Sequence, residues 1–209
     1  MQIELSKFLV VLRGEKFRMT ESQASRRTDL KLKLLILRCQ AGNEPAFGEL
    51  YERFNQSTLV FLKNLTDSEI AQDLNQEVWL QVYRQIATLA DARRFKAWLF
   101  QVARNKALDY FKSSKRLREL HEIMKPDKPL EVQMPFDEVD FNKSDLLKLS
   151  LDGLSPKLRE VIVLNFFEGM DYTEIAFILG CSLGTVKSRI YNGKLKIREL
   201  LETKILSHE

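Results

Sequence analysis

The chain contains few of the residues from which catalytic and metal sites are built. Its 209 residues include only two His and two Cys. Cys39 and Cys181 stand alone rather than in a CxxC pair, and His121 and His208 are distant from both in the sequence. A glycine loop that cradles phosphate and a GxSxG sequence are also missing. Because catalysis and metal binding usually draw on such groups, we expect no enzyme, no metal and no cofactor.

Other scarcities exclude further classes of protein. Eight Gly, five Pro and an apolar share of 44% argue against disorder and against a turn-rich β fold. The longest apolar runs, such as Phe8–Leu12, are too short to span a bilayer, and no signal-peptide cleavage site follows them. With lone cysteines, this favours a cytoplasmic protein without membrane insertion. Residues 1–18 are either a true extension or a start-site artefact before Met19.

Charge is strongly segregated along the chain, although the net charge is only +4. Residues 93–118 hold nine cations and one acid, whereas residues 41–92 hold eight acids and three cations. This asymmetry predicts one surface for a polyanion and another for a different partner. Residues 119–148 carry three prolines and eight acids against four cations, a composition typical of an extended linker.

Helical periodicity is present on both sides of this linker. Apolar residues recur every three or four positions at Leu30, Leu34 and Leu37, and again over 46–54, 67–88 and 93–118. Asn43 followed by Pro45 is typical of a helix start. We therefore predict an all-α fold of two small helical domains joined by a flexible acidic linker. The expected boundaries are an extension of uncertain order over 1–30, a first domain over 31–118, the linker over 119–148 and a second domain over 149–205.

The second domain contains a helix-turn-helix pattern over residues 171–190. Asp171 and Glu174 have the spacing of a capping box, Gly180 supplies the turn, and Ser182 can cap the next helix. Cations on the outward side of that helix, beginning with Lys187, favour DNA binding over an ordinary helical hairpin.

The basic helix of the first domain carries a polar stripe that also fits nucleic acid. A helical wheel puts Phe95 on the core face, Trp98 at its boundary, and Phe100 and Phe111 off that face. Aromatic side chains beside cations suit unpaired bases, on which stacking is worth ~1–3 kcal/mol. For Trp98 alone an ordinary core position is the favoured interpretation. The stripe consists of Arg94, Gln101, Asn105, Asp109, Lys112 and Arg116.

The helix expected over 67–88 has the opposite character. Its outward side shows Asp73, Gln76 and Glu77, with no cation before Arg84. Such a face repels DNA and favours a protein partner, although a plain solvated surface explains this segment equally well.

Four segments in this order resemble the extracytoplasmic-function (ECF) group of bacterial RNA polymerase sigma factors. They are Asp73–Trp79, Arg94–Tyr110, Leu154–Glu160, and Tyr172–Ala176 continuing through Gly184–Arg189. The resemblance implies that the first domain docks on the clamp helices of core RNA polymerase and captures the minus-ten promoter element as unpaired strand, with residues 89–95 pocketing a flipped base. It implies that the second domain reads the minus-thirty-five element as duplex and touches the polymerase flap. The linker would run toward the RNA exit path.

This resemblance gives each candidate residue a role. For polymerase binding they are Asp73, Gln76 and Glu77. For the minus-ten element they are Arg94, Phe95, Trp98, Gln101, Asn105, Asp109, Lys112 and Arg116. For the minus-thirty-five element they are Ser182, Gly184, Thr185, Lys187, Ser188, Arg189 and Lys194. Further partners implied are an anti-sigma factor or a recruiter that brings the protein to DNA.

Three departures from the family pattern and two alternative functions accompany these expectations. The departures are the N-terminal extension, Leu183 in place of a common proline, and Tyr191-Asn-Gly193 in place of a basic, alanine-containing run. A glycine inside a helix lowers helix stability by ~1 kcal/mol relative to alanine, which predicts fraying of the second helix at Gly193. Fraying there predicts weak duplex binding, and weak duplex binding predicts reliance on a recruiter. The alternatives are a stand-alone helix-turn-helix regulator and a protein-interaction adaptor.

Overall fold

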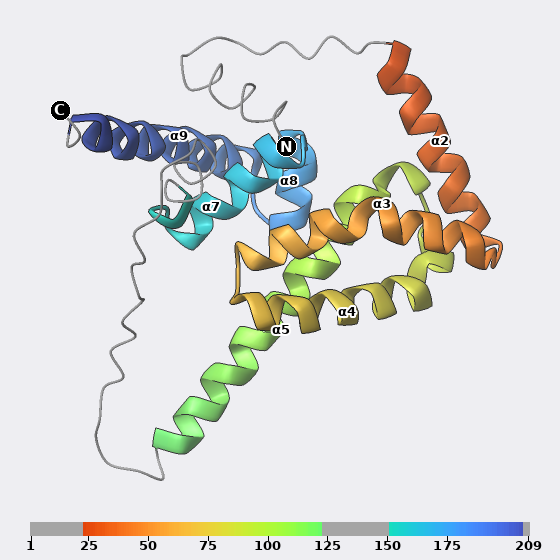
Figure 1. Ribbon diagram of the computed structural model, residues 1–209, viewed down its shortest axis with the longest axis horizontal. Coiled ribbons are helices and arrows are strands. Elements are labelled where there is room, and N and C mark those ends of the chain that lie inside the picture. The colour runs from red at the N-terminus through yellow and green to blue at the C-terminus, as the bar shows by residue number, and fades with distance from the viewer. Residues whose placement is uncertain (1–22, 123–150, 207–209) are drawn as a thin grey trace.

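The structure of the protein, a computed structural model, describes residues 23–122 and 151–206 (Figure 1). Every regular element in these two ranges is a helix. This confirms the predicted all-α class. None of the helices in these two ranges is long and apolar enough to cross a membrane. Most of the predicted linker lies outside the described residues, and α2 begins inside the predicted N-terminal extension. The helices are α2 (Gln23–Gln40), α3 (Glu44–Lys63), α4 (Ser68–Gln85), α5 (Phe95–Glu122), α7 (Pro156–Ile162), α8 (Tyr172–Leu179) and α9 (Leu183–Leu206), with short turns η1 (Ile86–Thr88), η2 (Ala92–Arg94) and η3 (Val163–Phe167).

Helix boundaries follow the local signals in the sequence. The Asn43 side chain accepts a hydrogen bond from the backbone N–H of Ala46, which caps α3 ahead of its proline. Asp171 accepts from the N–H groups of Thr173 and Glu174, and the Glu174 carboxylate accepts from the N–H of Asp171. The predicted capping box is thereby confirmed. Gly180 ends α8 with φ at 62°, a left-handed conformation that glycine adopts without strain.

The N-terminal unit, residues 23–122, is a bundle of α2 to α5 around an aromatic-rich core. Phe61 and Phe100 meet edge to face at 5.2 Å, and Phe54 and Phe95 meet at 5.6 Å. Each fully buried phenylalanine contributes about 1.5–3 kcal/mol. The prediction that Phe100 lies off the core face is wrong, because it is fully buried. Helix α5 packs on α3, α4 and α8, so its buried arc is wider than a single amphipathic stripe.

A buried polar network fixes α4 against α3. The Thr58 hydroxyl donates to Asn75 Oδ1 at 2.7 Å, and the Trp79 indole N–H donates to Thr58 Oγ1 at 3.3 Å. Asn75 Nδ2 donates in turn to Asn55 Oδ1 at 2.6 Å. Each buried polar group has a partner, and a satisfied network of this kind specifies one register for two packed helices.

Helix α2 presents two apolar faces. Its inward face buries Ile36 and Cys39, and burial raises the pKa of the Cys39 thiol. The periodic leucines that indicated the helix, Leu30, Leu34 and Leu37, instead lie on its outer side. A period of three to four fits either face of a helix, so it predicts the helix and leaves the buried side open.

The C-terminal unit, residues 151–206, depends on a close crossing of α7 and α9. A Cβ built on Gly193 would lie 2.8 Å from Ile162 Cγ1 and 3.0 Å from Ile162 Cδ1. Ile162 is fully buried, so glycine is the residue that fits at the contact. Gly193 is therefore a packing position inside a continuous α9, which removes the structural reason for expecting fraying there.

The two units lie against each other. Helix α8, the first helix of the helix-turn-helix, packs on α5 near the start of that helix (Figure 1). The sequence predicts two domains on a tether, and their direct contact is a feature that it does not reveal.

Candidate nucleic-acid and polymerase interfaces

The predicted minus-ten stripe forms an exposed row along η2 and α5. The side chains of Arg94, Asn105, Asp109 and Lys112 are all exposed. Lys112 Nζ lies 3.2 Å from Asp109 Oδ1 on the helix surface, an exposed pair that leaves both groups open to other partners. The row combines an amide, which can bond base edges, with cations that suit phosphates. The Arg116 side chain lies outside the described part of the chain.

Other predicted members of this site are placed differently. Phe95 is fully buried, as its wheel position indicates, and offers no surface to DNA in this arrangement. Trp98 is half-buried beside it, with ring centroids 6.1 Å apart. The Gln101 amide donates to the carbonyl oxygen of Phe177 in the C-terminal unit at 3.3 Å. Phe111, by contrast, is 46% exposed and is available for stacking.

The loop before α5 is held from both ends. Gln40 Nε2 donates to the carbonyl oxygens of Ile86 and Leu89, which ties the loop to α2. Asp91 caps η2 by accepting from the backbone N–H of Arg93 and pairs with the Arg93 guanidinium at 2.9 Å. The hydrogen bonds from Arg93 hold the pKa of the Asp91 carboxyl below its usual range. A fixed loop beside an exposed row of donors is suited to holding a displaced base.

The second helix of the helix-turn-helix, α9, directs its first turns outward. Ser182 Oγ accepts from the N–H of Thr185 at 3.1 Å and so caps the helix as predicted. Lys187 and Ser188 are exposed and Arg189 is half-buried, while Val186 and Ile190 are buried. Gly184 is exposed with only Ser182 Oγ near its Cβ position, at 3.7 Å.

The exposed face of α9 differs from the predicted one at Lys194, Tyr191 and Asn192. Lys194 Nζ lies 5.1 Å from the Phe166 ring centroid, and burial lowers the pKa of its amine. Tyr191 is 68% exposed and Asn192 is exposed, four residues after Lys187 and Ser188. Positions four apart share a helix face, so Tyr191 and Asn192 extend the exposed face that begins with Lys187 and Ser188. Sequence reasoning treated them as departures, although this spacing was sufficient to find them.

The acidic face of α4 is exposed as predicted and is partly apolar. Asp73, Gln76 and Glu77 are all exposed, and Glu77 pairs with Lys106 of α5 at 2.8 Å. Leu80 and Tyr83 continue the same face and are each 57% exposed. Sequence reasoning missed these two residues, which follow Gln76 at helical spacings of four and seven. An apolar strip edged by acids is typical of a protein-binding surface.

Comparison with known proteins identifies the family. The profile described as Sigma-70 region 2 matches residues 50–117, and that of Sigma-70, region 4 matches residues 144–197. The chain is 29% identical over 180 residues to the ECF RNA polymerase sigma-E factor of Haemophilus influenzae, covering 82% of this chain and 93% of that protein. It is 31% identical over 170 residues to the ECF sigma factor BldN of Streptomyces coelicolor, covering 80% and 64%. The chain belongs to the ECF group of RNA polymerase sigma factors.

Two solved structures are similar to this sigma factor. One is CnrH in complex with the cytosolic domain of CnrY, at 25% identity and a TM-score of 0.58, covering 82% of this chain and 97% of CnrH. The other is the sigma factor RpoE in complex with the anti-sigma factor NepR from Bartonella quintana, at 27% identity and a TM-score of 0.58, covering 75% and 96%.

This sigma factor directs RNA polymerase to promoters and is not itself an enzyme. The region 2 match ends within α5, and the region 4 match covers α7, α8 and most of α9. The region 2 match therefore contains the exposed row of η2 and α5 and the acidic face of α4, and the region 4 match contains the exposed face of α9. Within the described residues, no group of three metal-ligating side chains is found.

Proposed function

We propose that this sigma factor helps open promoters by capturing the unpaired minus-ten strand on the exposed row of η2 and α5. The observation that carries the proposal is this row, where Arg94, Asn105, Asp109 and Lys112 are exposed on a helix whose opposite side is fixed in the core. Side chains on a rigid helix hold their donors in place before the strand arrives, which lowers the entropic cost of binding.

Stacking and electrostatic contacts would offset the free energy that it costs to unpair and extrude bases. Extruding a base costs a few kcal/mol, and each base stacked on an aromatic side chain recovers ~1–3 kcal/mol. Trp98 is half-buried beside Phe95 and Phe111 is exposed, so each leaves part of its ring open. We propose that Asn105 bonds a base edge and that Arg94 and Lys112 neutralise phosphates. The fixed loop before α5 would hold a flipped base.

Replacing Asn105 by alanine tests strand capture in the reconstituted holoenzyme. We expect weaker permanganate reactivity of promoter thymines, because fewer unpaired bases are held, with little change in duplex binding. Ser113→Ala is the matched control, since Ser113 is exposed on α5 and its hydroxyl donates to the Tyr110 carbonyl oxygen of its own helix. Normal thymine reactivity in Asn105→Ala would remove this residue from the proposed role.

We propose that α9 reads the minus-thirty-five element as duplex. The exposed face formed by Gly184, Lys187, Ser188, Tyr191 and Asn192 would enter the major groove, where asparagine pairs well with adenine. Ser182, Thr185 and Arg189 would position the helix. Five cations lie within residues 187–198, namely Lys187, Arg189, Lys194, Lys196 and Arg198. Lys194 is held over Phe166, so about four of these five meet phosphates. The logarithm of duplex affinity should then fall with the logarithm of salt concentration at a slope of about −3.6.

We propose that the acidic face of α4 docks on core RNA polymerase, at the clamp helices. Asp73, Gln76 and Glu77 would give charge complementarity, and Leu80 and Tyr83 would supply the desolvated centre of the contact. Since RNA polymerase acts on the chromosome, this sigma factor would act in the bacterial cytoplasm. The C-terminal unit would in addition contact the polymerase flap.

Reversing two charges tests this docking surface. We expect Asp73→Arg with Glu77→Arg to abolish co-elution with core polymerase while circular dichroism shows an unchanged helical fold. The control reverses Glu44 and Glu52, two exposed acids of α3. Co-elution of the α4 variant at the level of the control would refute the assignment.

We propose that an anti-sigma factor also binds this protein. The support is its similarity to CnrH and RpoE, whose solved structures are complexes with the cytosolic domain of CnrY and with NepR. The alternative of a DNA-targeting recruiter no longer has fraying at Gly193 as its support.

A further inference from the structure

Helix α2 presents an apolar strip on its outer side. Leu30, Leu34 and Leu37 are 61%, 62% and 45% exposed, whereas Ile36 and Cys39 on the inward side are buried. Single exposed leucines are common on soluble proteins, but these three follow one another at spacings of four and three, so they form one continuous strip along two turns of helix. A continuous apolar strip of this kind marks a surface that binds another molecule.

The spacing of these three leucines is that of a coiled-coil seam, and we call them the leucine seam of α2. Apolar residues separated by four and then three positions occupy successive d, a and d positions of a heptad repeat. In this register, the residues that flank the seam at e and g are Lys31, Lys33, Arg38 and Gln40. The seam is therefore suited to packing against one further helix whose own apolar residues recur every three and four positions.

The flanks of the seam select the charge of that helix. Residues 30–40 contain three cations and no acid. Lys31 and Lys33 are exposed. The Arg38 side chain is 54% exposed, although one of its guanidinium nitrogens lies 3.9 Å from a Glu49 carboxylate oxygen. Charges at e and g decide which helices pair, because like charges across a seam repel and opposite charges attract. A helix with Asp or Glu at its flanking positions therefore complements this surface.

The same charges disfavour two other occupants of the seam. A second copy of α2 would bring Lys33 toward Arg38 in a parallel pair and Lys31 toward Arg38 in an antiparallel pair, so self-association is opposed by repulsion. Residues 1–22 of this chain hold three acids and four cations, so they carry no net negative charge to match the flanks. The seam also precedes the region 2 match, which begins at residue 50.

We infer that the leucine seam of α2 binds an acidic amphipathic helix of a protein partner. Apolar packing along the seam supplies most of the affinity, and the flanking cations set the choice of partner and its orientation. The inference does not rest on the proposed promoter and polymerase contacts, because those contacts use α4, α5 and α9 and the loop before α5.

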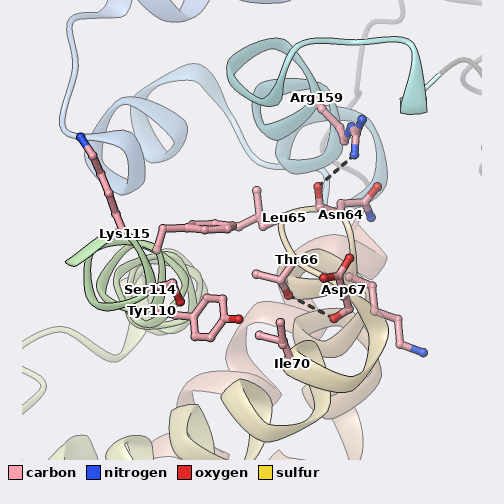
Figure 2. A pocket seen from close by; sticks show the side chains of 11 residues that line it. Asn64, Leu65, Thr66, Asp67, Ile70, Tyr110, Ser114, Lys115 and Arg159 are labelled. Atoms are coloured by element: carbon pink, nitrogen blue, oxygen red, sulfur yellow. Dashed lines mark hydrogen bonds between the residues drawn. The ribbon is translucent and has the colours of Figure 1, made fainter. Parts of the chain in front are cut away.

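Another surface of the protein also combines apolar side chains with cations. It is a cavity of about 490 Å³ between the α3–α4 turn, the later part of α5 and Arg159 of α7 (Figure 2). Leu65 of the turn, Ile70 of α4 and Phe111 of α5 line it together with Lys63. Because its apolar residues come from three separate elements, it offers no seam at helical spacing. It can attract an acidic peptide by charge alone, so Lys63 is the reference cation in the experiment.

A designed peptide tests the inference on the full-length protein. The probe is a fluorescein-labelled peptide of about three heptads with Leu at a and d and Glu at e and g, and fluorescence anisotropy measures its binding. We expect Leu34→Ala to weaken binding about tenfold, since this side chain lies in the middle of the seam. Leu195→Ala is the matched control, because Leu195 is 44% exposed on α9. A peptide with Ala in place of Leu keeps the charge and should not bind.

Reversal of the flanking charges tests the choice of partner. Lys31→Glu with Lys33→Glu should lose affinity for the Glu peptide and gain affinity for a peptide with Lys at e and g, which the parent should reject. The control is Lys63→Glu with Lys157→Glu, which reverses two exposed cations of α3 and α7 and should leave the preference of the parent. An unchanged preference in the α2 variant would contradict the role of its cations.

Three results would overturn the inference as a whole. Failure of the parent to bind the Glu peptide would show that the chain itself closes the seam or that the seam does not accept a helix. A dimer of the parent that Leu34→Ala dissociates in sedimentation would make a second copy the occupant. Equal binding by the parent and by Leu34→Ala with unchanged circular dichroism would place the peptide elsewhere. Loss of thymine reactivity in Asn105→Ala would stand in each case, so the two proposals fail separately.

Discussion

Replacing Gly193 by alanine tests whether the close crossing of α7 and α9 sets the stability of the C-terminal unit. Helix propensity alone predicts a gain of ~1 kcal/mol, because glycine is the poorer helix former. The structure predicts the reverse. The added Cβ would lie 2.8 Å from Ile162 Cγ1, whereas carbon atoms in favourable contact are about 3.5–4.0 Å apart. Ile162 is fully buried and its Cγ1 is near the backbone, so it cannot swing away freely.

The expected magnitude follows from these opposing effects. Overpacking of a core costs about 1–3 kcal/mol, which exceeds the propensity gain and gives a net loss of about 1–2 kcal/mol. For a chain of this size each kcal/mol shifts the melting temperature by about 2–4 °C. The measurement is thermal and urea unfolding followed by circular dichroism.

A matched substitution in the same helix supplies the control. Gly184→Ala adds the same methyl group to α9, where Ser182 Oγ at 3.7 Å is its nearest neighbour. We expect Gly184→Ala to be neutral or to stabilise by up to about 1 kcal/mol. In an Ile162→Ala background, Gly193→Ala should lose its penalty, because both contacting atoms are gone. A melting temperature that rises in Gly193→Ala as it does in Gly184→Ala would refute the close-crossing argument.

Three further predictions concern pH, the buried network and DNA reading. Burial raises the pKa of Glu160 against the opposing effect of Arg104, so the folded protein holds this proton more tightly than the unfolded chain does. Its contribution to the free energy of unfolding is therefore present below the ordinary pKa of about 4.3 and is lost as pH rises through the raised value. Between pH 4 and pH 7, the free energy of unfolding measured in urea should change less favourably in the parent than in Glu160→Gln, which isolates the Glu160 contribution from that of carboxyls such as Asp91. Thr58→Val should lower the free energy of unfolding by about 1–3 kcal/mol, because it leaves Asn75 Oδ1 buried without its donor. Thr66→Val is the control and should lower the free energy of unfolding by less than half as much. Asn192→Ala should relax selection at one base pair by about 1–3 kcal/mol in a randomised-duplex binding assay; an unchanged selected sequence would exclude it as a base reader.

Local features of this sigma factor were predictable because their causes lie within a turn or two of chain. The capping box of Asp171 and Glu174, the left-handed Gly180 and the cap at Asn43 are set by adjacent backbone geometry. The exposure of Asp73 and Glu77 on α4 and of Lys112 on α5 also agrees with the sequence pattern, because a charged side chain is buried only at high cost.

The errors and omissions in the predicted site have a different cause. Phe100 was placed off the core face, yet helices far along the chain cover it. Leu80 and Tyr83 were overlooked because apolar residues are expected inside, and only the packed bundle shows that both stay more than half exposed. Gly193 was predicted to weaken its helix, whereas the structure makes it a packing position. The reason is that the atoms nearest to its Cβ position belong to Ile162, 31 residues away in the sequence.

The sequence by itself determined the helices, their caps, the segregation of charge and the family, since each depends on residue type and short-range spacing. The tertiary structure alone decided which face of each helix is buried, which cations of α5 meet carboxylates of the other unit, and where glycine is the only residue that fits. Those properties depend on atoms brought together from distant parts of the chain, and no local pattern encodes their positions.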